Sequence, residues 1–552
     1  MSKRILIIGG VAGGASAAAR ARRLDEKSEI ILVERGEYVS FANCGLPYFI
    51  GGEVAQRDAL ILRTPKALKA QLNLDVRTRT EATAIDTAAK TVALRNLETG
   101  EESVESYDAL ILAPGATPVR PPIPGADLPE VHTLRDIPDV DALAAAADGA
   151  KKAVVIGGGF IGLEMTENLR KRGIEVALAE QLKQVLSPLD PEMAVYLHDE
   201  LEEKGVQLHL GDGVASIGRR EGGGVEVVLS SGARLDGDFA LLAVGVRPEV
   251  DLARRAGIAI GKRGGIVVDD RMRTSAPDVY AVGDAVEVRD FVTGKETLIP
   301  LAGPANRQGR VAAGAIFGRD TTYEGTQGTL IVRVFSQVAA ATGANEKTLQ
   351  AAGVPYEKIY LHHPSHVAYY PGSAMMAMKV LFSPRTGALL GAQIVGKDGV
   401  DRRIDVLATA LRLGATVYQL EDLELAYAPP FGAAKDPVNH AGFAAANVLR
   451  GDVVLAHWHE LRDGLDPARQ ILLDVRNPDE VEKGAMPNAL HIPLPQLRAR
   501  LREVPRDREI IVTCASGVRS YMACRILKQN GYDKVRNLSG GYRTWSVARR
   551  AT

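Results

Sequence analysis

Residues 152–162 read Lys-Ala-Val-Val-Ile-Gly-Gly-Gly-Phe-Ile-Gly, an apolar run followed by a glycine-rich turn. The run predicts a buried strand, and the spacing G-x-G-x-x-G after it precedes an expected helix over 163–172. Such a turn lets the backbone approach a pyrophosphate, which the free N–H groups of the helix N-terminus then bind. We therefore predict dinucleotide binding through four turn positions: Gly157, Gly159, Ile161 and Gly162.

An acidic residue follows this turn at the distance expected for binding a ribose. Glu180 ends a predicted strand over 176–179. Its carboxylate suits a ribose hydroxyl and would repel a 2′-phosphate, which favours NADH over NADPH. Lys183 is near enough in the sequence to leave NADPH open.

The same pattern occurs at the start of the chain, with a strand over 4–8, a turn over 9–14, a helix over 15–24 and a strand ending at Glu34. The match is looser, because Val11 stands where the second glycine is expected. Alone, it would also fit an ordinary turn between a strand and a helix. Two matches in one chain favour a second dinucleotide site.

Composition shifts divide the rest of the chain. Four prolines within 118–124 and a turn near 245–255 predict two crossings between domains. The first domain is then discontinuous, over 1–150 and 251–322, and encloses a second over 151–250. Shorter strands and Ala-rich helices follow over 323–447, and a compact α/β domain occupies 453–552. The fold class is α/β with two Rossmann-like domains, an α+β domain and a C-terminal α/β domain.

The overall composition excludes several functions. The net charge is -1 and aromatic residues make up 5%, which disfavours nucleic acid and anionic membranes as partners. No apolar run reaches the ~20 residues of a membrane span, and the N-terminal run is too short for an export signal. Only 3 cysteines in 552 residues indicate a reducing compartment, so we expect a cytoplasmic protein. No metal site is predicted.

Residues 274–284, Thr-Ser-Ala-Pro-Asp-Val-Tyr-Ala-Val-Gly-Asp, complete a resemblance that covers about residues 1–447. Together with the two nucleotide turns, they resemble the pyridine nucleotide–disulfide oxidoreductases. The resemblance implies FAD in the first domain, with Asp284 at the flavin ribitol, NADH in the second, and a homodimer formed through 323–447. The other cofactor contacts that it implies are Gly9, Val11, Ala12, Gly14, Glu34, Arg35, Ala113, Gly245, Gly283 and Ala302.

Cys44 has no partner cysteine nearby. Family members with a redox disulfide use the spacing C-x-x-x-x-C, but the matching position here is Phe49. Cys44 must therefore act alone, as a thiolate, sulfenic acid, mixed disulfide or persulfide. Peroxidases and oxidases of the single-cysteine branch carry a histidine in the first turn, where this chain has Val11 and Ala12. The segments that instead resemble coenzyme A-disulfide reductases are 40–48, 369–372, 401–405 and 427–431.

This closer resemblance implies a reaction. Electrons would pass from NADH through FAD to a sulfur attached to Cys44. Tyr427 and Tyr369 would lie near the cysteine, where a phenol could donate a proton to the departing sulfur. Packing at the dimer interface is the alternative for both tyrosines, and for Tyr369 it has equal weight.

Coenzyme A (CoA) contacts are implied in the same way. Arg20 and Arg23 match arginines that hold CoA phosphates, although a solvated arginine face is the competing interpretation. The remaining matches are Ser16, Ser40 and Asn43, and, contributed in the family by the other subunit, Asn306 and Lys435.

Residues 514–519, Cys-Ala-Ser-Gly-Val-Arg, form a second reactive loop, between a predicted strand over 509–513 and a helix over 520–529. Backbone N–H groups of such a loop can hold an anion. The loop resembles the rhodanese active site, as do residues 473–476, 484–489 and 538–542. That implies a persulfide on Cys514, with Arg519 facing an anionic donor. The spacing C-x-x-x-x-R is one residue shorter than in low-molecular-weight phosphatases, and Cys524 is expected in the core.

Our leading hypothesis is a homodimeric FAD enzyme that uses NADH to reduce CoA persulfide, polysulfide or CoA disulfide, with sulfane sulfur carried on Cys514. The alternative is a CoA-disulfide reductase that maintains the thiol pool, with an independent rhodanese domain. A third hypothesis makes that domain an inactive docking or regulatory module, which the intact Cys514 and Arg519 argue against.

Overall fold

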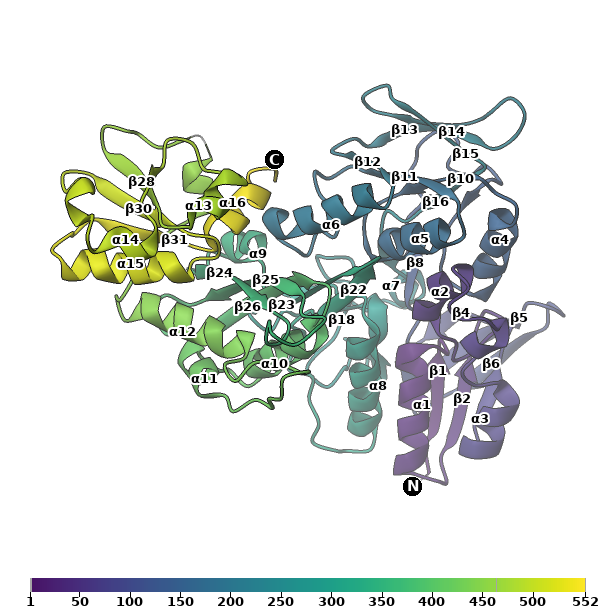
Figure 1. Ribbon diagram of the computed structural model, residues 1–552. Helices are drawn as coiled ribbons and strands as arrows, with labels where there is room; N and C mark the ends of the chain where they lie inside the picture. Colours follow the sequence, from purple (N-terminus) through teal and green to yellow (C-terminus); the bar gives the residue numbers. More distant parts are fainter. Residues whose placement is uncertain (1, 463, 552) are drawn as a thin grey trace. The chain divides into compact units, whose positions relative to one another are not determined.

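The computed structural model describes residues 2–462 and 464–551. The chain forms two compact units, one of Met1–Gln181 with Gly205–Gly328 and the other of Leu182–Lys204 with Thr329–Thr552. Both units combine sheets with helices (Figure 1). Among the described residues, no helix has the length and apolar character needed to cross a bilayer.

The first sheet of the first unit is parallel and carries the N-terminal nucleotide turn. Its order is β19-β7-β1-β2-β3, formed by Val279–Ala281, Ala109–Leu112, Arg4–Ile8, Glu29–Val33 and Asp75–Arg77. The apolar residues of β1 and β2 are buried, as expected for a sheet covered on both faces. Helix α1 (Ala12–Leu24) packs beside α8 (Ala302–Ile316), which places two distant segments together (Figure 1).

The second sheet repeats this arrangement around the Gly157 turn. Its order is β12-β11-β10-β16-β9, formed by Gln207–Leu210, Glu175–Glu180, Lys152–Ile156, Phe239–Leu242 and Val131–His132. Helix α5 (Phe160–Lys171) follows β10 and begins three residues before the predicted start at 163.

Strand β9 differs from the sequence-based division of the chain. Residues 1–150 were assigned to the first domain, yet β9 lies in the second sheet, paired with β16. A two-residue strand has no periodicity, so only its pairing could reveal it. At the two predicted crossings, strand β8 (Ala116–Pro118) pairs antiparallel with strand β17 (Val246–Pro248). The other predicted domain boundaries stay predictions.

The second unit contains an antiparallel and a parallel sheet. The antiparallel order is β22-β23-β26-β25-β24, formed by Leu330–Val334, Gln337–Gly343, Leu389–Gly396, Met375–Phe382 and Glu357–Pro364. Helix α10 (Val400–Arg412) packs against β23 and β26. Helix α6 (Pro191–Glu203) also belongs to this unit.

The C-terminal sheet is parallel and presents the Cys514 loop. Its order is β27-β31-β30-β28-β29, formed by Leu455–Ala456, Val535–Leu538, Glu509–Thr513, Gln470–Asp474 and Leu490–His491. The loop leaves β30 and enters α15 (Val518–Gln529), two residues earlier than predicted. The last helix, α16 (Gly541–Ala548), packs against α6.

Candidate functional site

A cleft of about 1050 Å³ opens at the carboxyl ends of β1 and β2 in the first unit. This is the edge at which ligands bind in open parallel sheets, and the volume suits an extended dinucleotide. The predicted cofactor residues that line it are Gly9, Val11, Ala12, Glu34, Arg35, Ala113, Gly283 and Asp284. FAD therefore fits the residues of this cleft.

The first turn has no room for side chains at two of its glycines. At Gly9, with φ +99°, a Cβ would lie 2.0 Å from the carbonyl oxygen of Ala113. At Gly14 it would lie 1.8 Å from the carbonyl oxygen of Gly9. Glu34 accepts hydrogen bonds from Gly10 N and Gly36 N, both at 2.8 Å, which fixes its carboxylate at the cleft. Backbone packing thus explains why the looser match still forms a nucleotide turn.

The second turn has the same geometry. A Cβ at Gly162 would lie 1.9 Å from the carbonyl oxygen of Gly157, and Glu180 accepts a hydrogen bond of 2.6 Å from Gly158 N. These contacts place the Glu180 carboxylate beside the N-terminus of α5, where a ribose hydroxyl would bind. Gly245 lies at the crossing of β8 and β17, and Ala302 is the exposed first residue of α8.

Cys44 lies exposed in a short 3-10 helix (Asn43–Gly45), and its neighbour Asn43 lines the cleft. The surrounding protein partly desolvates the thiol, which raises the pKa of Cys44. The carboxylates of Glu164 and Asp284 raise this pKa further. Ser40, at φ +51°, precedes this helix. A free thiol therefore lies next to a residue of the cleft and near two negative charges.

Alkylation of Cys44 is expected to report this electrostatic environment. The thiolate is the reactive form, so a raised pKa makes the reaction with iodoacetamide slow at neutral pH. The alkylation rate should then increase at a higher pH than it does for an ordinary thiol. Glu164→Gln removes one of the negative charges and should shift the pH profile to lower pH. The label is measured on the peptide that contains Cys44, which separates it from Cys514 and Cys524, at 1% and 0% exposure.

The matched control is Glu175→Gln, an exposed carboxylate on the neighbouring strand β11. It should leave the profile unchanged, and Cys44→Ser should abolish the labelling. A profile that Glu164→Gln leaves in place, or moves to higher pH, would contradict the assigned electrostatics.

Four arginines gather near the contact of α1 and α8. Arg20 and Arg23 come from α1, Arg310 from α8 and Arg319 from the segment after it. Partial desolvation and the positive charges of the other three lower the pKa of Arg20. Ion pairs to carboxylates are absent for these four among the described residues. The cluster is thus a site where phosphate groups would be bound favourably.

Ser16 and Asn306 join the same surface through a hydrogen bond between their side chains. The contribution of Asn306 to the site of the other subunit, which the resemblance implied, stays a prediction. Arg22 on the same helix is different in role. It is buried and donates to carbonyl oxygens of four residues, which makes it a structural residue.

Two tyrosines lie together in the second unit. The hydroxyl groups of Tyr369 and Tyr427 are 3.4 Å apart, and this hydrogen bond raises the pKa of Tyr369. Both side chains are exposed. Lys435 is also exposed, and its neighbour Asp436 binds the buried Arg403 at 2.9 Å. The predicted proximity of both tyrosines to Cys44 stays a prediction.

Cys514 lies in a cradle formed by its own loop. Its Sγ accepts hydrogen bonds from Gly517 N at 3.2 Å and Ser520 Oγ at 3.3 Å. Its carbonyl oxygen accepts from Tyr542 N at 2.8 Å, which ties the loop to the start of α16. The cradle can therefore hold an anionic sulfur through N–H and O–H donors. Cys524 is buried in the core, and burial raises its pKa far above the ordinary thiol value.

Arg519, which the sequence predicted to face an anionic donor, is paired with a carboxylate at this loop. Its guanidinium donates two hydrogen bonds of 2.6 Å to the two carboxylate oxygens of Glu480. These bonds lower the pKa of Glu480 to about 2, so the pair is fully charged at neutral pH. The positive charge at the loop is therefore largely compensated.

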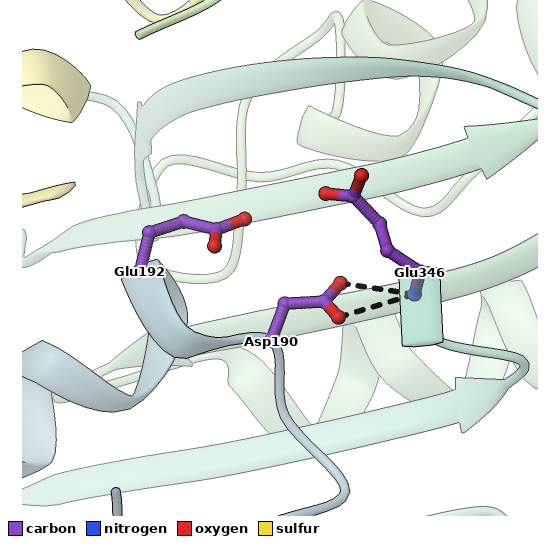
Figure 2. A group of neighbouring side chains, drawn as sticks. All are labelled: Asp190, Glu192 and Glu346. Atoms are coloured by element: carbon purple, nitrogen blue, oxygen red, sulfur yellow. Dashed lines mark hydrogen bonds between the residues drawn. The ribbon is translucent and has the colours of Figure 1, made fainter. Parts of the chain in front are cut away.

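A buried group of carboxylates lies in the second unit, formed by Asp190, Glu192 and Glu346 (Figure 2). The backbone N–H of Glu346 donates to Asp190. Lys379 Nζ binds Asp190 at 2.7 Å, Glu192 at 2.5 Å and also Glu346. Burial opposes the charge of Lys379, but the carboxylates hold its pKa well above the ordinary value. The Lys379 ammonium is thus the cation that all three carboxylates share, and Lys358 also binds Glu346 at 2.7 Å.

Lys379→Met is expected to destabilise the protein by about 3–5 kcal/mol, because it leaves the buried carboxylates of Asp190 and Glu192 without their cation, whereas Glu346 keeps its ion pair with Lys358. Urea unfolding of the full chain measures this loss. Lys397→Met, at an exposed lysine of the same unit, should change the unfolding transition little. Equal effects of the two substitutions would contradict the assigned role.

Several site residues were not predicted from the sequence. Arg135, Thr117 and Glu249 line the cleft, where Arg135 Nη1 binds Glu249 at 2.6 Å. They come from separate loops and strand ends, so no spacing connects them. Arg310 could have been found, because it follows Asn306 by four residues and shares its helix face. No feature of the sequence predicted that Glu480 pairs with Arg519.

Two nucleotide turns on parallel sheets, a single exposed thiol at the first cleft and a cysteine cradle in a separate α/β domain define a class. The class is that of the dinucleotide-dependent oxidoreductases with an appended sulfurtransferase-like domain. Family comparisons agree with it. The pyridine nucleotide-disulphide oxidoreductase model matches residues 3–309, its dimerisation domain 331–437 and the rhodanese-like domain 457–548.

The chain therefore belongs to the pyridine nucleotide-disulphide oxidoreductase family and carries a rhodanese domain, as the sequence predicted. Membership implies FAD and a pyridine nucleotide as cofactors. The coenzyme A disulfide reductase of Staphylococcus haemolyticus is 35% identical over 449 residues, which cover 81% of this chain and 100% of that protein.

Two solved structures match nearly the whole chain. Reduced Bacillus anthracis CoADR-RHD superposes with a TM-score of 0.96 and 48% identity, covering 99% of this chain and 98% of that one. The NAD-dependent persulfide reductase from A. fulgidus has a TM-score of 0.91 and 39% identity, covering 98% and 100%. The predicted fold class is thereby confirmed.

Proposed function

We propose that this chain reduces sulfur bound to coenzyme A through Cys44, with CoA persulfide or polysulfide preferred to CoA disulfide. The observation that carries the proposal is the single exposed thiol next to Asn43, which lines the cofactor cleft, without a second cysteine to form an internal disulfide. The acceptor sulfur must then come from outside the chain. Relatives named coenzyme A disulfide reductase and persulfide reductase support this choice.

The residues of α1 and α8 would bind the substrate. Arg20 and Arg23 would bind the CoA phosphates. Arg310 and Arg319 lie in the same cluster and extend the positive surface. The hydrogen-bonded pair of Ser16 and Asn306 adds polar contacts. Ser40 and Asn43, on either side of the turn before Cys44, contact the pantetheine arm, and Lys435 of a homodimer adds a contact.

Cys44 would act as the nucleophile. FAD, when bound in the cleft, supplies two-electron transfer from NADH, or from NADPH, to sulfur. The Cys44 thiolate would attack the outer sulfur of CoA persulfide, which breaks the S–S bond, forms Cys44–S–SH and releases the CoA thiolate, and a hydroxyl of the Tyr427–Tyr369 pair would donate a proton to that thiolate. Two electrons from the reduced nucleotide would then cleave the new S–S bond, release hydrosulfide and restore the Cys44 thiolate. In total, NADH and CoA persulfide give NAD⁺, CoA and hydrosulfide.

Cys514 would carry sulfane sulfur for this reaction. Its cradle of N–H and O–H donors suits a persulfide anion. A rhodanese domain in the same chain is the reason for preferring persulfide or polysulfide to CoA disulfide. The alternative is a CoA-disulfide reductase with an independently acting rhodanese domain. The name of the Staphylococcus haemolyticus relative, coenzyme A disulfide reductase, supports this alternative.

Anaerobic NADH oxidation distinguishes these functions. CoA persulfide, CoA disulfide and hydrogen peroxide are compared as acceptors with the same holoenzyme. We expect the highest kcat/KM with CoA persulfide. The highest value with CoA disulfide would favour the alternative, and the highest value with peroxide would refute both.

A further inference from the structure

The charge around Cys514 is balanced by carboxylates of the same domain. Arg519 lies close enough to Cys514 for the two side chains to interact electrostatically. However, both outer nitrogens of its guanidinium are bound to Glu480, and each side chain of this pair is 28% exposed. A bidentate pair of this kind leaves little of the arginine charge for an incoming anion.

A second arginine beside the cradle is compensated in the same way. Arg476 binds Asp474 through Nε and Nη2, with distances of 2.6 to 3.0 Å, and both side chains are buried. Its guanidinium lies 4.2 Å from the ring centre of Tyr542, whose N–H binds the carbonyl oxygen of Cys514. Neither arginine is therefore an open site for a dianion.

The outer face of the first turns of α15 is apolar. Val518 and Met522 are 57% and 43% exposed, and their spacing of four residues places them on one side of the helix. Such a surface next to the loop favours uncharged or singly charged donors over strongly hydrated anions.

We propose that Glu480 determines which sulfur donors Cys514 accepts, by neutralising Arg519. Donors of low charge, such as small-molecule persulfides, are accepted, and dianionic donors such as thiosulfate are disfavoured. This inference rests on the proposed sulfur-carrying function of Cys514 and adds the class of donor to it.

The two donors differ in charge and leaving group. With a persulfide, the Cys514 thiolate attacks the outer sulfur of R–S–SH, a Cys514–sulfur bond forms, and the thiolate R–S⁻ leaves. With thiosulfate, the same attack on the outer sulfur releases sulfite, SO₃²⁻. Neither transfer needs an external oxidant or reductant. Thiosulfate brings two negative charges to a cradle that already contains the Glu480 carboxylate.

Glu480→Gln tests the proposal without removing the local structure. Glu480 is also part of the capping box of α13 (Pro478–Glu482), in which its carboxylate accepts from Asn477 N at 3.1 Å. A glutamine oxygen can keep this bond, so the helix should persist. The substitution removes the charge and frees Arg519 for an anion. Glu482→Gln, at an exposed carboxylate two residues away, is the matched control.

The experiment measures thiocyanate formation by the full-length holoenzyme, with cyanide as acceptor and either thiosulfate or cysteine persulfide as donor. Cys514→Ser gives the uncatalysed rate. We expect Glu480→Gln to lower the KM for thiosulfate about tenfold, the gain of one hydrogen bond to a charged group. The persulfide kcat/KM should stay within about twofold of wild type, and Glu482→Gln should match wild type with both donors.

Three results would overturn the proposal. An unchanged KM for thiosulfate in Glu480→Gln would show that the Glu480–Arg519 pair does not select donors by their charge. Loss of activity with both donors would give Glu480 a structural role only. If the wild type turned over neither donor faster than Cys514→Ser does, sulfur transfer by Cys514 itself would be refuted, and with it this inference.

Discussion

Cys44→Ser is expected to lower NADH-dependent reduction of CoA persulfide and CoA disulfide by at least about 10³-fold, the scale on which loss of a nucleophile acts. The hydroxyl is a far weaker nucleophile than a thiolate at neutral pH. Cys44 is the exposed cysteine of the three, and no second cysteine lies near it in the sequence to take over its role. Steady-state NADH oxidation under anaerobic conditions gives the measurement.

A dye acceptor separates loss of the nucleophile from loss of the cofactors. NADH oxidation coupled to an artificial dye does not need Cys44 and should stay within about twofold of wild type. The serine side chain is nearly isosteric and Cys44 is exposed, so folding should not suffer. Full turnover of either CoA substrate by Cys44→Ser would refute the assigned nucleophile.

Cys514→Ser is expected to abolish sulfur transfer from persulfide donors to cyanide, with a loss of at least about 10³-fold. The persulfide can form only on sulfur, and the other thiol of this domain, Cys524, is fully buried and has a strongly raised pKa. Reduction of CoA disulfide by NADH should stay within about twofold of wild type, because Cys44 carries that reaction. The two assays, run on the same preparation, separate the two cysteines.

The complementary variant completes the comparison. Cys44→Ser should retain sulfur transfer to cyanide while losing CoA disulfide reduction. If Cys514→Ser transfers sulfur as fast as wild type, the sulfane-carrying role of the C-terminal domain is wrong. If it loses CoA disulfide reduction as well, the two sites are not separable as assigned.

Much of the fold could be predicted because the informative features are local. Strand β10 (Lys152–Ile156) coincides with the apolar run of the sequence, and backbone atoms exclude a Cβ at the first and last glycines of both turns, Gly9, Gly14, Gly157 and Gly162. Period and spacing are properties of contiguous residues, so sequence reveals them. By contrast, β9 joins its sheet through a partner more than 100 residues later, and two residues carry no period.

The site was predicted less completely, because contacts between distant residues determine its electrostatics. The sequence identified Cys514 and Arg519 from one loop, but Glu480, which compensates Arg519, lies on another helix. In the same way, Glu164 lies on α5, after the second nucleotide turn, and its carboxylate raises the pKa of Cys44. The sequence alone identified these reactive residues, whereas the charged groups that surround them could be identified only from the three-dimensional structure.

Mass spectrometry of the peptide that contains Cys44 tests the central claim most directly. The holoenzyme is incubated with CoA disulfide without NADH, quenched in acid and digested. We predict a CoA mixed disulfide on Cys44 that disappears when NADH is added before the quench, and no adduct in Cys44→Ser. An unmodified Cys44 in an enzyme that turns over CoA disulfide with NADH would contradict the claim that this thiol exchanges sulfur with coenzyme A.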